Sequence, residues 1–164
     1  MAQPLCTSLF AKIEEQLDRT IHISATLPQD LHLTALDSPW TTRQLLNHLL
    51  NCTSGFCAVL AAVFPEDLAH FSELRESSAN SISSRNEFCQ RLNLYHTHIG
   101  EGFQLLDDHA LARRIPTVFV PSGETVLTLL LGNLEHLINH KHQLFLYAKF
   151  FGATLASRDL YHFR

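Results

Sequence analysis

Three histidines lie close together in an otherwise apolar segment near the C-terminus. They are His136, His140 and His142, within the sequence NLEHLINHKHQLFLYAKFFG that covers residues 133–152. Burying an imidazole without a polar partner is unfavourable. Imidazole is also a common metal ligand, and its charge changes near neutral pH. The segment therefore contains candidate metal ligands on what its apolar pattern predicts to be a helix.

Helical geometry separates these three histidines into a pair and a single residue. Each helical residue advances by about 100°, so residues four apart lie on one face. His136 and His140 are therefore paired at the edge of the apolar face, whereas His142 should face solvent. This spacing lets one helix offer two imidazoles to one metal ion. The alternative is that the two histidines are partly exposed and bonded to water. A third ligand from another helix would favour the metal site over this alternative.

A candidate third ligand lies in an earlier apolar segment. His48 stands among leucines in the sequence QLLNHLL, so it is either a core histidine with a hydrogen-bond partner or a ligand. Two other helical metal motifs are absent. HLINH lacks the glutamate of H-E-x-x-H, and no glutamate is followed three residues later by histidine, as in di-iron bundles. What remains is a mononuclear three-histidine site, which would leave a coordination position open.

Five further residues are candidates for the surroundings of this site, namely Cys52, His96, Lys141, Gln143 and Tyr147. Cys52 is either a ligand or a small buried hydrophobe. Lys141 either orients an anionic substrate or forms a salt bridge with the first helix. His96 either reaches the metal cavity as a proton shuttle or lies at a surface edge. Gln143 either supports a ligand or is exposed, and Tyr147 either lines a pocket or belongs to the core. No catalytic residue is assigned.

Four segments carry the apolar periodicity of amphipathic helices. They run over about residues 5–21, 41–65, 88–106 and 125–152. A T-x-x-Q capping box at Thr41 and Gln44 begins the second segment, and Gly152 is a typical C′ residue for the fourth. Residues 66–83 are expected to form a connecting loop, with or without a short helical turn, and TVFV at 117–120 a short strand or an extended loop. The pattern predicts one all-α domain over residues 1–164, a four-helix bundle with a longer crossover.

Composition limits the classes of function. The 164 residues are 46% hydrophobic and 17% charged, which is typical of a folded protein. The formal net charge is -4, and the sequence contains no basic stripe of the kind that binds nucleic acid. We therefore expect no nucleic acid partner. No apolar run approaches the ~18 residues of a membrane span. The four cysteines show no CxxC spacing, and we expect a cytoplasmic protein with reduced thiols.

Two stretches give the sequence a resemblance to a known family, the DinB-like or YfiT-like helical bundle proteins. In WTTRQLLNHL, Trp40 precedes His48 by eight residues, which resembles the W…H at the start of that family's second helix. The stretch HLINHKHQLFLYAKFFG resembles the family's H-x3-H-R-x-Q…G ending. The resemblance covers about residues 37–152.

The resemblance implies a metal site at His48, His136 and His140 that binds one divalent ion, zinc or nickel above all. It also implies a homodimer and, as in some relatives, a low-molecular-weight thiol as cosubstrate. We expect a metal-dependent enzyme that acts on a small molecule by hydrolysis or thiol transfer. The alternative is a non-catalytic metal-binding or small-molecule-binding protein of a stress response. One departure is Lys141, where the family usually has arginine, because lysine lacks the bidentate geometry of a guanidinium.

Overall fold

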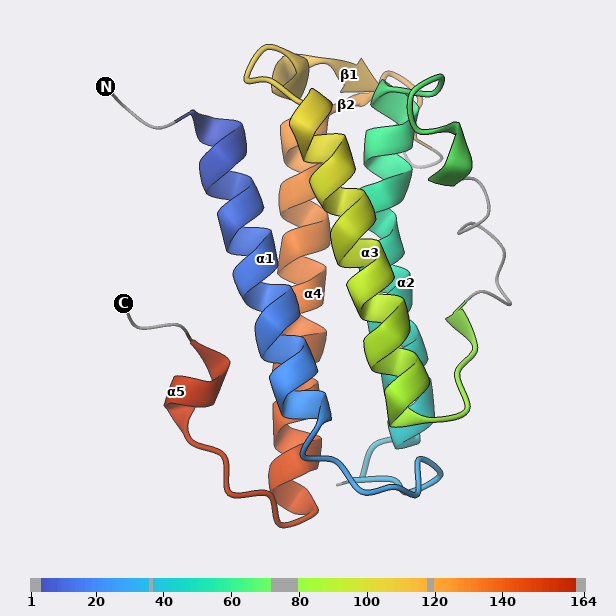
Figure 1. Cartoon of the computed structure of the whole chain (residues 1–164), viewed down its shortest axis with the longest axis vertical. Coiled ribbons are helices and arrows are strands. Elements are labelled where there is room, and N and C mark those ends of the chain that lie inside the picture. Colours follow the sequence, from blue (N-terminus) through green and yellow to red (C-terminus); the bar gives the residue numbers. More distant parts are fainter. Residues whose placement is uncertain (1–3, 36, 72–79, 118–119, 162–164) are drawn as a thin grey trace.

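Four long helices lie side by side in the computed structural model, which describes residues 4–35, 37–71, 80–117 and 120–161 (Figure 1). The long helices are α1 (Leu5–Ser24), α2 (Thr42–Val63), α3 (Arg85–Leu105) and α4 (Val126–Phe150). Smaller elements are a 3-10 turn (Ala110–Ala112), β1 (Arg114–Ile115), β2 (Glu124–Thr125) and α5 (Ser157–Leu160). The mostly helical bundle confirms the predicted fold class.

Side-chain caps fix where three of these helices begin. Thr41 accepts a hydrogen bond from the Gln44 backbone while the Gln44 side chain accepts one from the Thr41 backbone, so the predicted capping box is present. Ser84 caps α3 and Thr125 caps α4 in the same manner, each accepting from the backbone N–H three residues later. Such caps satisfy N–H groups that the first helical turn leaves unpaired. The residues at which α2 and α4 begin are therefore set by local sequence.

The first helix is capped from a distant segment. Pro4 precedes α1 and offers no side-chain cap. Instead, the two carboxylate oxygens of Asp108 accept hydrogen bonds from the backbone N–H groups of Leu5 and Cys6, at 3.1 and 2.9 Å. An anion is favourable at the positive end of the helix dipole. Asp108 thus joins the start of α1 to the chain that leaves α3.

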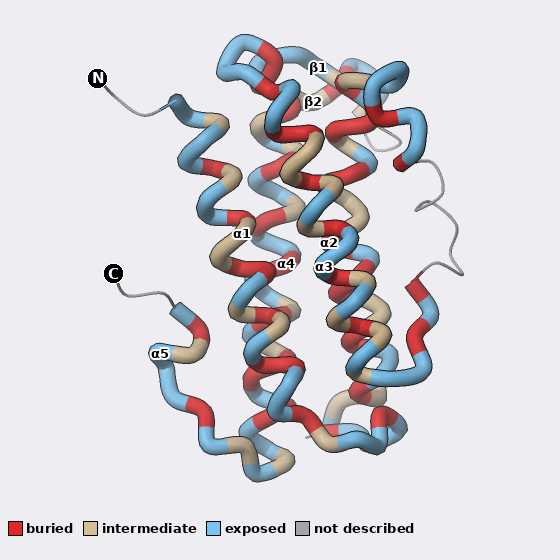
Figure 2. Tube along the Cα trace, viewed as in Figure 1, coloured by how far each residue is buried: buried red, intermediate tan, exposed pale blue. Residues whose placement is uncertain are grey.

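One apolar core runs through the bundle, and Figure 2 shows buried positions facing inward along all four long helices. Representative side chains with no exposed surface are Ile13, Phe56, Leu92 and Leu130, one from each helix. At Gly55 of α2 the Asn133 side chain of α4 packs against the glycine, because an added Cβ would lie 2.7 Å from the side-chain oxygen of Asn133. This contact joins the two histidine-bearing helices.

The connections differ in detail from the sequence prediction. A two-stranded antiparallel sheet forms, but it pairs Arg114 with Thr125 and Ile115 with Glu124. The strands thus flank TVFV, of which residues 118–119 lie outside the described part. In the loop at 66–83, the short helical turn that the sequence allowed is present over 69–71, and residues 72–79 lie outside the described part. Gly152 follows α4 with a φ of 91°, as a C′ glycine does.

The end of the described chain packs back onto the bundle. In α5, Leu160 is buried, and Asp159 lies 2.9 Å from the Nε2 atom of His22 on α1. The segment up to residue 160 thus packs on the chain's own bundle.

Among the described residues, α2 alone has the length and composition of a membrane-crossing helix, with a mean hydropathy of 1.4 over its best window. Of that window, 56% is buried inside the bundle. Burial of this kind is what the core helix of a bundle needs, so the apolar composition of α2 is accounted for by packing against its neighbours.

Candidate metal centre

Three imidazoles from two helices converge on one point. His48 lies near the start of α2, and His136 and His140 lie one turn apart in the middle of α4. The Nε2 atom of His48 is 3.1 Å from Nε2 of His136 and 3.0 Å from Nε2 of His140. The structure therefore brings together all three residues that the sequence singled out as ligands, and His142 is exposed as predicted.

The three Nε2 atoms form a donor set that suits a cation. A neutral imidazole carries a single N–H, so three converging Nε2 atoms can have at most one or two N–H donors between them. The remaining nitrogen lone pairs then face one another with too few donors to satisfy them. A metal ion at ~2.1 Å from each nitrogen would hold ligands about 3.0 Å apart at right angles and about 3.4 Å apart in a tetrahedron. The two observed distances fall within this range, so the side chains fit a metal with little rearrangement.

The local environment keeps these rings neutral, as ligation requires. Burial lowers the pKa of His48, and the neighbouring His140 and His136 lower it further. Burial and His140 likewise lower the pKa of His136. Neutral imidazole is the form that binds metal. At neutral pH these two rings are thus ready to ligate without first losing a proton.

A hydrogen bond to Gln143 fixes the orientation of His140. Its Nδ1 atom lies 3.0 Å from the side-chain oxygen of Gln143, which accepts a hydrogen bond from Nδ1–H. Nε2 then carries the lone pair and faces the other two rings. Such partners hold the tautomer and ring orientation of metal-ligating histidines. Gln143 therefore supports the cluster, which is the first of the two roles considered from sequence.

An aromatic side chain covers the cluster on one side. The Trp40 ring is stacked on His140 with centroids 5.7 Å apart and lies 4.9 Å from His48. Tyr147 donates a hydrogen bond to the backbone carbonyl of Trp40 at 2.7 Å, and it is buried in the core. Tyr147 thus positions Trp40 instead of lining the site itself. The stacking of Trp40 on His140 was not predicted.

Cys52 also belongs to the cluster. Its sulfur and the three ligand nitrogens all lie within 4.8 Å of one another, and the side chain is buried. Burial raises the pKa of its thiol to about 12, so the metal-free protein holds it protonated at neutral pH. Cys52 is the fourth potential ligand, and no carboxylate belongs to this group among the described residues.

The structure favours the second of the two roles considered for Lys141, a link to the first helix. Its ammonium, on a different face of α4 from the histidines, donates 2.7 Å hydrogen bonds to the Gln16 side chain and the Leu160 carbonyl. Lys141 joins α4 to α1 and α5, and burial lowers its pKa to about 8. It is not placed to orient a substrate at the histidines, and the α1 side chain that accepts its hydrogen bond is the Gln16 amide.

His96 also lies away from the cluster. Its Nε2 atom is 3.0 Å from a carboxylate oxygen of Glu14 on α1. Both residues line a cavity of about 410 Å³ between α1 and α3, and no member of the three-histidine cluster lines it. His96 therefore cannot serve as a proton shuttle there, because α3 places it at the α1 side of the bundle.

Sequence reasoning missed a second group of potential ligands. His70, His98 and Glu101 place ligand atoms within 4.8 Å of one another. The spacing H-x-x-E of His98 and Glu101 is a signal that could have been read, since it puts both on one helical face. His70 comes from a distant turn, and no local pattern announces it.

Known proteins share the fold but little of the sequence. No protein-family model matches the chain, and no curated protein sequence matches it. A DinB-like protein, YjoA, from Bacillus subtilis has a similar structure, with a TM-score of 0.69 at 18% identity over 90% of this chain and 94% of that one. A mycothiol-dependent maleylpyruvate isomerase has a TM-score of 0.59 at 13% identity over 94% of this chain, which spans 64% of the isomerase's length.

Proposed function

We propose that this chain, which has the fold of DinB-like proteins, is a metal-dependent enzyme that acts on a small molecule. His48, His136 and His140 would hold one divalent ion, zinc or nickel being the leading choices for imidazole ligands. The observation that carries the proposal is the convergence of their Nε2 atoms at 3.0 and 3.1 Å from His48. When bound, such an ion supplies Lewis acidity to a small electrophile or nucleophile.

Exposure of the cluster supports a catalytic role over a purely structural one. His136 is exposed and His48 and His140 are partly exposed, so the cluster lies at the edge of the bundle core and not inside it. Trp40 gives that point an apolar wall, which would help to position an apolar part of a substrate. The protein's own contribution is to orient three rings, through Gln143 for His140 and through packing between α2 and α4 for the others.

Two reaction classes follow from this site, hydrolysis and thiol transfer. The structurally similar isomerase is described as mycothiol-dependent, which supports a low-molecular-weight thiol as cosubstrate. For hydrolysis the nucleophile would be water. Among the described residues the ligand group has no carboxylate, so neither class has an evident general base from the protein.

The proposal is tested by assaying the metal-loaded protein against two panels. One panel contains esters and amides, and the other pairs low-molecular-weight thiols with small electrophiles. We expect turnover in one panel that is lost in His48→Ala, His136→Ala and His140→Ala and retained in His142→Ala, an exposed control on the same helix. Turnover that survives all three ligand substitutions would contradict the proposal.

A second candidate function is non-catalytic metal binding, and Cys52 is the observation that favours it. A fourth ligand would close the coordination sphere, as in structural zinc sites. Metal content of Cys52→Ala separates the two. An open site keeps its ion with affinity close to wild type, whereas a closed four-ligand site loses much of its affinity. Bound metal without turnover in either panel would also favour this candidate.

The expected homodimer and cytoplasmic location stay predictions. Size-exclusion chromatography with light scattering on the full chain would measure the first. Fluorescence microscopy of a fluorescently tagged chain, expressed in the source organism, would test the cytoplasmic location.

A further inference from the structure

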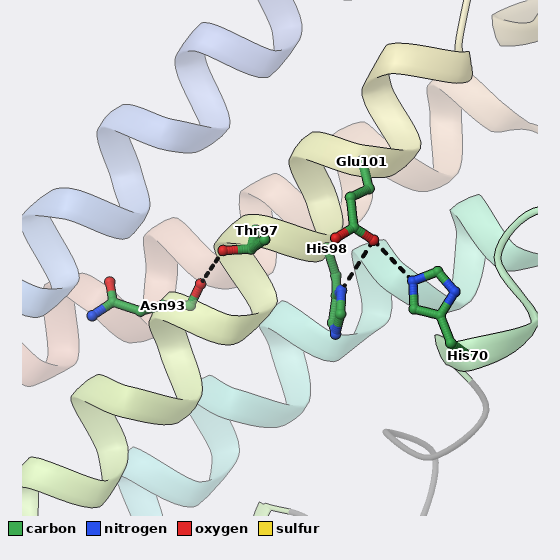
Figure 3. Close-up of polar contacts among 5 residues, drawn as sticks. All are labelled: His70, Asn93, Thr97, His98 and Glu101. Carbon is green, nitrogen blue, oxygen red and sulfur yellow. Dashed lines mark hydrogen bonds and ion pairs between the residues drawn. The ribbon is translucent and has the colours of Figure 1, made fainter.

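A second group of metal-ligating side chains lies far from the three-histidine cluster. His70 is in the helical turn that follows α2, and His98 and Glu101 are one turn apart on α3 (Figure 3). His48 lies fifteen residues before the end of α2, and at 1.5 Å per residue this corresponds to roughly 20 Å of helix. The two groups share no residue, so the second would act independently of the first.

One carboxylate oxygen of Glu101 lies within hydrogen-bond distance of both imidazoles. Glu101 Oε2 lies 2.9 Å from Nε2 of His70 and 3.2 Å from Nδ1 of His98. Figure 3 shows the His98 ring directed toward this oxygen from α3, the helix that also carries Glu101, and the His70 ring from the turn after α2. Two ligands that each lie ~2.1 Å from one ion are about 3.0–3.4 Å apart at the usual coordination angles. Both distances are close to that range, so small side-chain shifts would admit an ion.

Packing beneath the group restricts where the rings can go. Phe71 is buried, and its ring contacts His70 and His98 with centroids 4.7 and 4.8 Å away. The His98 side chain is only 15% exposed, whereas those of His70 and Glu101 are 50% and 40% exposed. A buried aromatic thus anchors the turn, while the carboxylate edge stays open to an ion arriving from solvent.

Charge also favours a cation here. The hydrogen bond from His70 lowers the pKa of Glu101, and His98 lowers it further. The carboxylate is therefore ionised at neutral pH, flanked by two imidazoles. Two histidines and one carboxylate form the donor set of several catalytic zinc and non-haem iron sites. Either ring can turn its lone pair to the ion by carrying its proton on the other nitrogen.

We propose that His70, His98 and Glu101 form a second binding site for a divalent transition-metal ion. The ion would tie the turn after α2 to α3. Since Glu101 also lines the cavity of about 410 Å³ between α1 and α3, the site stands at the edge of a space large enough for a small ligand.

The test is calorimetric titration of untagged full-length protein with Zn²⁺, in a His48→Ala, His136→Ala background that disables the first cluster. We expect one ion per chain to bind. Adding Glu101→Gln, which removes the charge but keeps the side-chain size, should weaken this binding at least 10-fold. Adding His142→Ala, which removes an exposed histidine elsewhere, should leave it unchanged.

Two outcomes would overturn the proposal. One is absence of binding in the background variant at submillimolar Zn²⁺. The other is equal binding with and without Glu101→Gln, which would mean that surface histidines hold the ion and that Glu101 only accepts two hydrogen bonds. Because Glu101 is partly exposed, its variant should fold, and far-UV circular dichroism of each variant checks this. The Co²⁺ absorption spectrum provides a second readout, since two nitrogens and one oxygen give a different visible band from a hexaaqua ion.

Discussion

At the scale of single residues, the site depends on which nitrogen of each imidazole is free. His48, His136 and His140 turn Nε2 inward, and the Gln143 side chain fixes this choice for His140 by accepting from Nδ1–H. The sequence could identify the three converging histidines as candidate ligands, because helical spacing pairs His136 with His140 and His48 is the histidine of another apolar helix. It could not reveal the Trp40 ring stacked on His140, since that contact depends on how the chain before α2 returns to α4.

Gln143 provides the first prediction at this scale. Gln143→Leu removes the acceptor for His140 Nδ1–H, so the ring loses its fixed tautomer. We expect metal affinity to fall about 10- to 100-fold, measured by competition with a chromophoric chelator. Gln143→Glu keeps an acceptor and should bind at least as tightly as wild type. Equal affinities for the leucine and glutamate variants would show that Gln143 does not orient the ligand.

At the scale of elements, local signals determined the starts of α2, α3 and α4, and tertiary contacts determined the start of α1 and the positions of the side chains that join the helices. The box at Thr41 and Gln44 was evident in the sequence. The destination of Lys141 was not, because the sequence wheel places it within the apolar arc without saying that Gln16 and Leu160 supply its partners. The cap from Asp108 onto α1 was also invisible, since it joins residues about a hundred positions apart.

Thr41→Ala tests the start of the histidine-bearing helix α2. The substitution removes the side-chain acceptor for the Gln44 backbone, and we expect a loss of about 1 kcal/mol in the free energy of unfolding. Urea denaturation measures it. Thr97→Ala is the matched control, because Thr97 is an exposed threonine inside α3 that caps nothing. An equal loss in both variants would remove the capping explanation.

Asp108→Asn tests the cap on α1 through its pH dependence. Hydrogen bonds from Cys6 and Leu5 lower the pKa of Asp108 below its ordinary 3.8. A carboxylate with a depressed folded-state pKa stabilises the protein above its unfolded-state pKa, and this stabilisation disappears as pH falls through the folded value. Wild type should therefore have a higher urea midpoint than Asp108→Asn at pH 7, and the difference should shrink below pH 4.

The control for this prediction is Asp67→Asn, which removes the same charge from an exposed turn. Its midpoint should follow that of wild type across the titration. A difference between wild type and Asp108→Asn that stays constant from pH 7 to pH 2 would contradict the proposed role of the ionised carboxylate.

At the scale of the whole molecule, we expect the bundle to fold without a metal ion. The core draws fully buried side chains from all four long helices, and the three histidines lie at its edge. This differs from zinc fingers, in which the ion supplies most of the folding free energy. A bundle of this kind could be predicted from sequence because each helix shows its own apolar stripe. The contact of α5 with α1 could not, because four residues carry no periodic signal.

Metal binding should nevertheless raise stability by mass action. At a free metal concentration of 100 times Kd the gain is about 2.7 kcal/mol, or about 5–10 °C in Tm for a chain of this size. Thermal unfolding followed by circular dichroism measures it, in a Glu101→Gln background that removes the second proposed site. The metal-free protein should keep its helical spectrum, and addition of His48→Ala should abolish the gain. A metal-free protein without helical signal would contradict the account of the core.

The central claim is that one ion binds where the three imidazoles meet. Anomalous diffraction measures this most directly, with crystals of untagged protein loaded with zinc and data collected on both sides of the zinc edge. We predict an anomalous peak at ~2.0–2.2 Å from the Nε2 atoms of His48, His136 and His140, absent in crystals of His48→Ala. A wild-type map with no peak between these rings would contradict the claim, whatever peaks lie elsewhere.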